Sequence, residues 1–173
     1  MSTVQKLIFQ DLPGYQYKVL PDGIHPINEE DLDILFVKPF PDSVTRQNIS
    51  NGFYNFRKKI QSFFASEMWI DGSFVESKRD PIDVDVVVLI LAHDFNNLSQ
   101  IRQDEFIEIF RENHQTTKTT YLTDAYFMIV FPKDHLNFNY TQQEQFYWQK
   151  LFGRTRTKQS KGLIKLEVPF IRS

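Results

Sequence analysis

The sequence predicts a single α+β domain in which a mixed β-sheet carries helices packed mainly on one face. A chain of 173 residues is long enough to bury one hydrophobic core. Short β-branched runs alternate with longer segments whose apolar residues recur every three or four positions. No repeat, low-complexity tract or linker divides the chain. We therefore take residues 1–173 as one domain, with an N-terminal extension at 1–45 and a core at 46–173.

The composition narrows the class of protein further. With 41% hydrophobic and 24% charged residues, the chain matches an ordinary globular protein rather than a disordered one. A formal charge of -2 provides no overall attraction for nucleic acid. The absence of cysteine excludes disulfides and thiolate zinc sites and fits a reducing compartment. No stretch reaches the about 18 apolar residues of a membrane span, so we expect a cytoplasmic protein without membrane contact.

The N-terminal elements are the least regular. QKLIF and YQYKVL are candidates for short edge strands, and LPG and PDG are turn signals. Asn28 is predicted to cap a helix, because asparagine is favoured at that position and the acidic residues that follow it interact favourably with the helix dipole. The predicted helix ends before the KPFPDS loop.

The core alternates helices and strands. Apolar spacings of three and four predict a helix from about Ser43 to Ala65 whose aromatic face packs in the core rather than stacking on bases. The remaining periodicities predict, in order, a strand at MWI, an interior strand at 83–91, a helix at 101–110, a strand at 121–131 ended by Pro132, and a last strand at 162–168. Thr141 with Glu144 forms a capping box, which predicts that a third helix begins there.

Asp83 and Asp85 open the predicted interior strand. Alternate residues of a strand share a face, so two carboxylates lie side by side and repel each other. Lysine, arginine or hydrogen bonds can offset this repulsion, and most such pairs are simply solvated. An oxygen-only pair on a rigid strand is also the ligand type that Mg²⁺ prefers when phosphate-bearing substrates bind.

Gly72 and Ser73 follow the preceding strand. A glycine there lets the backbone approach a ligand closely, and the serine adds a hydroxyl to the backbone N–H donors. Such a turn suits phosphates, although a Gly-Ser pair after a strand is more often a plain connection.

The two features together resemble the signature of the DNA polymerase beta-like nucleotidyltransferase superfamily. The residues are "IDGS", nine residues, and "DVDVVV". The resemblance covers Met68 to Phe131 and implies a nucleotidyltransferase-like fold. It assigns the nucleotide's phosphates to Gly72 and Ser73, and two divalent metals, Mg²⁺ or Mn²⁺, to Asp83 and Asp85.

The family pattern also has a third acid on a later strand. Asp124 is the sole carboxylate in YLTDAYFMIVF, and an acid among apolar neighbours calls for a partner. The alternative is a strand-end aspartate that faces water. By the resemblance, Asp124 would complete the coordination of the metal that activates the acceptor. An NTP would be the substrate.

Several basic residues are candidates for the leaving-group side of the reaction. Lys78 and Arg79 lie between the two halves of the motif, where they either bind phosphate or are simply solvated. The tail FGRTRTKQSKGLIK holds a further five, which either clamp a triphosphate or nucleic acid or protect a sheet edge: Arg154, Arg156, Lys158, Lys161 and Lys165. The histidines His25, His93, His114 and His135 have no metal-site spacing.

Two functions follow from these residues. The first is a metal-dependent nucleotidyltransferase that moves NMP from an NTP to a protein, RNA or nucleotide acceptor. The second is a weakly active or inactive nucleotide-binding subunit that works through a partner, as in a bacterial toxin-antitoxin or phage-defence complex. The chain is also similar to a little-characterised bacterial group of stand-alone nucleotidyltransferase-like proteins, in "WIDGSFV", "DAYF" and "FGR". It departs from the antitoxin type at 76–79 and 81–82, where that type has a further glycine and a serine. A protein partner or a homo-oligomer would build the other wall of the cleft.

Overall fold

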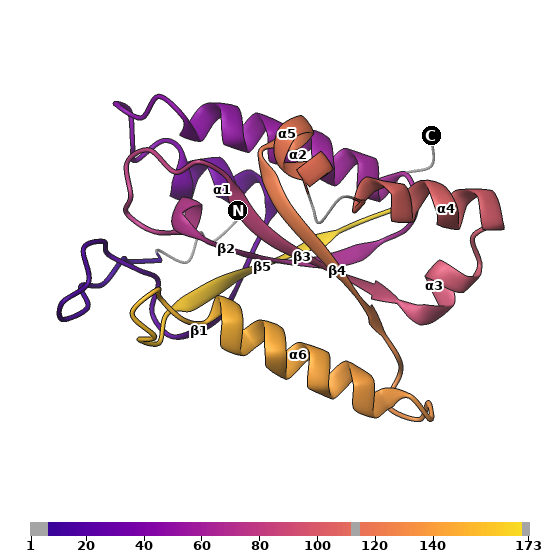
Figure 1. Ribbon diagram of the computed structural model, residues 1–173. Coiled ribbons are helices and arrows are strands. Elements are labelled where there is room, and N and C mark those ends of the chain that lie inside the picture. Colours follow the sequence, from indigo (N-terminus) through magenta and orange to yellow (C-terminus); the bar gives the residue numbers. More distant parts are fainter. Residues whose placement is uncertain (1–6, 112–114, 171–173) are drawn as a thin grey trace.

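A mixed five-stranded sheet organises the molecule (Figure 1). The computed structural model describes residues 7–111 and 115–170. The strand order is β1-β5-β2-β3-β4, with bounds β1 Gly23–Ile27, β2 Ser66–Asp71, β3 Val84–Leu91, β4 Thr123–Val130 and β5 Gly162–Val168. β2 is antiparallel to both of its neighbours, whereas β1 is parallel to β5 and β3 is parallel to β4. The predicted α+β class with a mixed sheet is confirmed.

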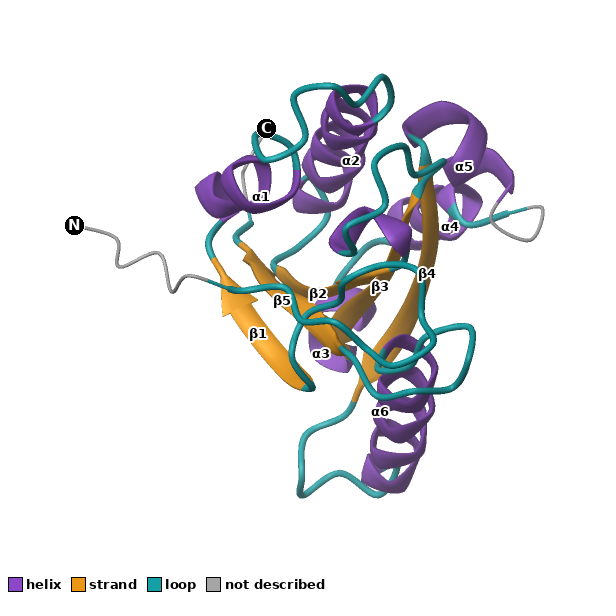
Figure 2. Ribbon diagram, turned by 90° about the vertical axis from the view of Figure 1, so that its left-hand side faces the viewer, coloured by secondary structure: helices purple, strands orange, loops and turns teal. Residues whose placement is uncertain are grey.

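The helices lie on both faces but mainly on one. Their bounds are α1 Glu29–Phe36, α2 Arg46–Gln61, α3 Ala92–Asn96, α4 Gln100–Ile109, α5 Gln115–Tyr121 and α6 Phe138–Phe152. Figure 2 shows α1, α2, α4 and α5 on one side of the sheet and α6 on the other. Over residues 7–111 and 115–170, no helix has the length and apolar character needed to cross a bilayer.

The two faces bury cores of different size. The larger core packs the apolar stripe of α2 against alternate residues of β3, and side chains such as Phe56, Ile60 and Val86 are fully buried. The predicted role of this helix in the core is confirmed. The smaller core lies under α6 and consists of Trp69, Val87, Leu89, Met128, Trp148, Phe152 and Leu163.

Most elements of the core match the sequence predictions. α2 is a few residues shorter at each end than predicted, α4 and β5 lie within a residue of the predicted bounds, and β3 is an interior strand between β2 and β4. Asn28 caps α1, and its backbone N–H donates to Asp31 Oδ2 at 3.3 Å.

Two predicted element starts and one predicted helix cap are wrong. The helix predicted from Thr141 begins one turn earlier, at Phe138 after Asn137. Thr141 does not cap it, because its buried hydroxyl accepts a hydrogen bond from the Phe131 N–H at 2.8 Å and ties α6 to the end of β4. The strand predicted from Tyr121 starts at Thr123, because the preceding residues form α5. Between them Leu122 has φ 52, a backbone conformation that ends the helix.

The N-terminal strands are also corrected. Gln10 and Val19 form an isolated bridge rather than paired strands, and the first part of QKLIF, like His114, lies outside the described residues. The edge strand is β1, which begins at the glycine of the PDG signal. β1 and α1 thus join the same sheet and core as the rest of the chain.

Candidate active site

A row of carboxylates crosses three neighbouring strands. Asp71 on β2 is the register partner of Asp85 on β3, and Asp85 is level with Asp124 on β4. Because alternate residues share a face, all three lie on the same face as Trp69, Val87 and the α6 side of the sheet. Asp83 lies one residue before β3. The strand ladder therefore gathers acids that are up to 53 residues apart in the chain.

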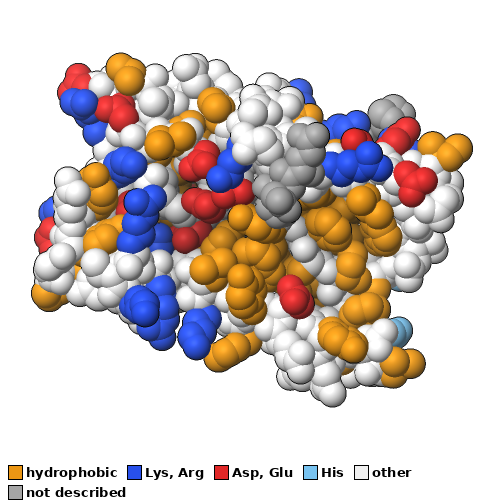
Figure 3. Space-filling model, viewed as in Figure 1, with side chains coloured by type: hydrophobic (Ala, Val, Ile, Leu, Met, Phe, Trp, Pro, Cys, Tyr) orange, Lys and Arg blue, Asp and Glu red, His pale blue; other side chains and the backbone are white. Residues whose placement is uncertain are grey.

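These acids line a cavity of about 580 Å³ at one end of the sheet. In Figure 3 acidic side chains gather in a hollow, with basic side chains to the left and hydrophobic ones to the right. Of the residues predicted to form the site, the cavity brings together Gly72, Ser73, Lys78, Asp83, Asp85 and Asp124. Arg79 is not among the lining residues. Its exposed side chain pairs with Asp80 at 2.6 Å.

The Gly-Ser turn is in direct contact with the acid row. Gly72 has φ 81, a conformation that disfavours side chains. A Cβ at this position would overlap the Asp85 carboxylate. Ser73 begins a short 3₁₀ turn that ends at Val75. Glycine is therefore what lets the turn lie against Asp85.

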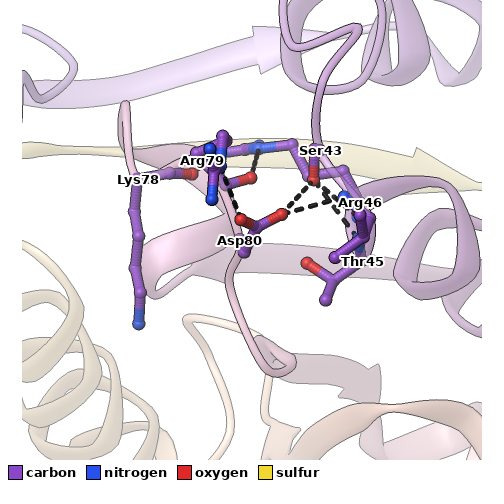
Figure 4. Close-up of polar contacts among 7 residues, drawn as sticks. Ser43, Thr45, Arg46, Lys78, Arg79 and Asp80 are labelled. Atoms are coloured by element: carbon purple, nitrogen blue, oxygen red, sulfur yellow. Dashed lines mark hydrogen bonds and ion pairs between the residues drawn. The ribbon is translucent and has the colours of Figure 1, made fainter.

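Arg46 shapes the loop that follows this turn. Its fully buried guanidinium donates to five backbone carbonyls: those of Phe36, Phe74, Glu76, Lys78 and Arg79. Burial lowers the pKa of Arg46 to about 10, so it stays charged at neutral pH. In Figure 4 the Lys78 side chain extends away from this network. Arg46 thus fixes the backbone from which Lys78 reaches the cavity.

Asp80 fastens the same loop to the start of α2. Its Oδ1 accepts from the Ser43 hydroxyl and the Val44 N–H, and its Oδ2 accepts from Arg79 (Figure 4). These bonds lower the pKa of Asp80, with the Arg79 bond as the largest cause. Arg79 therefore has an exposed contact within its own loop, which is closer to the solvated alternative than to phosphate binding.

Lys161 is buried between two acids. Its ammonium lies 2.9 Å from Asp71 Oδ1 and 2.6 Å from Glu76 Oε1. The Tyr15 hydroxyl donates to the other Glu76 oxygen at 2.9 Å, and burial together with this bond raises the pKa of Tyr15 to about 12. One of the basic residues of the tail therefore joins the N-terminal segment, the loop after β2 and the start of β5 at the cavity wall.

Lys118 neutralises the other side of the row. Its ammonium lies 2.7 Å from Asp124 Oδ2 and 3.7 Å from Asp83 Oδ2. The bond to Asp124, followed by the charges of Asp124 and Asp83, raises the pKa of Lys118 against the opposing effect of burial. Of the four aspartates that line the cavity, Asp85 has no ion pair with either lysine within 4 Å.

The acids at the centre of the row hold their protons more tightly than free carboxyls. Burial, followed by the charges of Asp83 and Asp124, raises the pKa of Asp85 to about 6. Burial also raises the pKa of Asp71 to about 7, although Lys161 acts in the opposite direction. The electrostatics therefore favour an added positive charge next to Asp85.

The donor chemistry of this wall fits a hard divalent cation. Asp83, Asp85 and Asp124 offer carboxylate oxygens alone, and the buried Asp124 Oδ1 has no hydrogen-bond partner within the described chain. As the side chains stand, however, the described residues contain no group of three or more acids or histidines arranged to hold a metal ion. Lys118 supplies positive charge to two of these acids instead. A cation that took Asp124 Oδ2 as a ligand would have to displace Lys118 from it.

Several residues of the cavity were not predicted to belong to it: Tyr15, Tyr17, Asp71, Glu76, Lys118 and Tyr126. The signal for Asp71 was its position directly before the Gly-Ser turn. Lys118 lies in TTKTTY, which has no apolar period, so neither its helix nor its orientation was readable.

Comparison with known proteins gives one match. The model of DUF6932, described as a family of unknown function, matches residues 13–167. No curated protein matches the chain, and no solved structure matches it.

Proposed function

We propose a function for this chain, which belongs to the DUF6932 family of unknown function, from the arrangement of its cavity. In this proposal the chain is a metal-dependent nucleotidyltransferase that moves NMP from an NTP to a protein, RNA or nucleotide acceptor in the cytoplasm. The observation that carries the proposal is the packing of the Gly72–Ser73 turn against Asp85, which is level with Asp124 on the adjacent parallel strand. The turn that we propose binds phosphate and the proposed metal-binding carboxylates line one cavity.

Each residue has a role that its position supports. Asp83, Asp85 and Asp124 would hold Mg²⁺ or Mn²⁺, which when bound would stabilise charge on the attacking and leaving oxygens. The Ser73 hydroxyl and the Gly72 backbone would donate to the triphosphate. Lys78 and Arg156 line the same cavity and would offset the phosphate charge. A volume of about 580 Å³ falls in the range of small-molecule sites.

Labelled nucleotides test this proposal directly. The protein is incubated with each α-phosphate-labelled NTP, Mg²⁺ or Mn²⁺, and acceptors that include RNA and the protein itself. Asp83→Ala and Asp85→Asn are expected to lower label transfer by about a hundredfold or more, because each removes charge that holds the cation. Asp94→Ala is the matched control, since the Asp94 side chain is 28% exposed and that of Asp83 is 27% exposed. Unchanged transfer in both site variants would refute the metal role.

The Lys118 bridge favours a second candidate. A lysine that already neutralises Asp83 and Asp124 suits a regulatory subunit that binds a nucleotide and acts through a protein partner or a second copy. That reading predicts saturable NTP binding without transfer to any acceptor. It also predicts that Asp83→Ala leaves NTP affinity unchanged, whereas the transferase loses affinity for the metal nucleotide.

A further inference from the structure

We infer that Lys118 is a tethered counter-cation that competes with the metal for the acid row, so that the metal binds well only together with the nucleotide. The inference rests on the proposed function and concerns the regulation of the same site. Its basis is that the Lys118 ammonium already lies 2.7 Å from Asp124 Oδ2. Because that carboxylate is a proposed metal ligand, and its other oxygen, Oδ1, has no hydrogen-bond partner among the described residues, the ammonium and a divalent cation compete for its negative charge.

The helix that carries Lys118 is held in place. Thr117 is fully buried, and its hydroxyl accepts a hydrogen bond from the Ala125 N–H at 3.4 Å. Gly52 of α2 packs so closely on the Tyr121 carbonyl that a Cβ there would overlap it. The backbone of α5 is thus wedged between α2 and β4, and Lys118 leaves the acids by rotating its own side chain.

The Lys118 side chain is partly exposed, so it has room to rotate away from the acids. The Lys118 side chain is 38% exposed, whereas that of its partner Asp124 is 12% exposed. The ammonium is at the open side of the pair, and its four-carbon stem is flexible. Its titratable neighbours are Asp83, Asp85, Asp124 and the Tyr126 hydroxyl, all of which act on it electrostatically.

A nucleotide changes the balance because it brings its own negative charge. With the metal alone, displaced Lys118 loses its carboxylate partners and gains only water. With a metal–triphosphate complex, the displaced ammonium has phosphate oxygens within the same cavity. Lys118 therefore makes metal and nucleotide binding depend on each other, and it limits metal binding in the absence of substrate.

Manganese titration tests this inference without any measure of activity. Free Mn²⁺ is followed by electron paramagnetic resonance with wild type, Lys118→Met and Lys118→Arg, with and without an NTP analogue that has an uncleavable α–β bridge. Lys118→Met is expected to bind Mn²⁺ about tenfold more tightly in the absence of nucleotide, and to lose most of the gain that the analogue gives wild type. Lys118→Arg keeps the charge and is expected to resemble wild type.

Lys165→Met is the matched control. Lys165 lies 2.8 Å and 3.8 Å from two acids and is 31% exposed, a geometry close to that of Lys118, but it is outside this cavity. Its Mn²⁺ affinity is expected to equal that of wild type. Asp85→Asn added to Lys118→Met should abolish the gain, which assigns it to the acid row.

The outcomes separate the inference from the proposed function. If Lys118→Met binds Mn²⁺ no more tightly than wild type and Lys165→Met, the inference is wrong. If Lys118→Met binds more tightly while wild type transfers no label to any acceptor, the inference stands and the transferase proposal fails. Circular dichroism and the thermal unfolding midpoint with EDTA establish that each variant is folded, so that a loss of binding is not a loss of structure.

Discussion

Single residues set the geometry of the cavity, and Gly72 is the most constrained of them. Its backbone conformation and its contact with Asp85 are separate reasons for the absence of a side chain. Gly14 separates the two effects, because it has a similar φ of 72 but no atom within 4 Å of an added Cβ. Gly14→Ala is therefore a control for the effect of a positive φ in the absence of an overlap.

Gly72→Ala should destabilise the protein more than Gly14→Ala does. A positive φ strains both variants, and Gly72, with ψ -171, lies in a region that is essentially restricted to glycine. The overlap with Asp85 adds about 1–3 kcal/mol in Gly72→Ala alone. Urea unfolding in EDTA measures the difference. Equal losses in the two variants would show that Asp85 moves aside at no cost.

Arg46 is the second residue whose loss should be severe. Arg46→Met removes the donor to five carbonyls, and the bonds to those of Phe36, Phe74 and Glu76 are buried, so we expect a loss of about 3 kcal/mol or more in the free energy of unfolding. Arg102→Met is the comparison, because Arg102 donates to one carbonyl and is 36% exposed. Its loss should stay within about 1 kcal/mol. Similar losses for the two would contradict the organising role of Arg46.

At the scale of elements, the ladder of β2, β3 and β4 makes the acid row sensitive to pH. A carboxyl whose pKa is raised on folding keeps its proton to higher pH in the native state than in the unfolded chain. Its contribution to stability is full below about pH 4 and is lost as the pH rises through the native pKa, which is about 6 for Asp85 and about 7 for Asp71. Metal-free protein should therefore lose stability between about pH 4 and pH 7 from these groups.

Asp85→Asn isolates one part of this dependence. The variant should gain stability relative to wild type as the pH rises, by about 2 kcal/mol between pH 4 and pH 8, because the amide never places a charge in this buried position or next to Asp83 and Asp124. Urea unfolding in EDTA across this range gives the difference, with Asp94→Asn as the control. A difference that does not vary with pH would mean that Asp85 is ionised normally.

The elements also show how far the sequence alone could lead. The helical period in α2 and the β-branched run in β3 are local signals, so both elements were predictable. The motif placed Asp83, Asp85, Asp124, Gly72 and Ser73 at one site, and the cavity brings them together. The sequence could not predict that Lys118 and Lys161 pair with the acids of the site. Their ion pairs depend on the packing of α5 beside β4 and of β5 beside β2. The Thr141 prediction failed because its hydroxyl satisfies the Phe131 amide rather than its own helix.

On the scale of the whole molecule, the two sides of the sheet should differ in stability. The core under α2, α4 and α5 contains many fully buried aromatic side chains, while α6 is held by a cluster of seven buried residues. Helices with fewer buried apolar contacts open with a lower free energy. The cavity takes one wall from the end of α6, so this difference reaches the site.

Native-state hydrogen exchange tests this difference. Amides of α6 should exchange faster than those of α2, through an opening that leaves the larger core intact. Trp148→Ala should accelerate exchange in α6 and leave α2 nearly unchanged, since Trp148 packs on Tyr126 and Phe152 within the smaller core. Equal acceleration in both helices would mean that the molecule unfolds as one cooperative unit.

The parallel pairing of β3 with β4 has a further consequence for Asp85 and Asp124. The separation of these two positions is a property of the main chain, about the 4.8 Å between neighbouring strands, and not of any side-chain contact. Substitutions elsewhere in the cavity therefore leave the pair level. A slip of β4 by one residue against β3 would instead turn Asp124 to the opposite face. The pairing of β4 with β3 therefore decides which side of the sheet Asp124 faces.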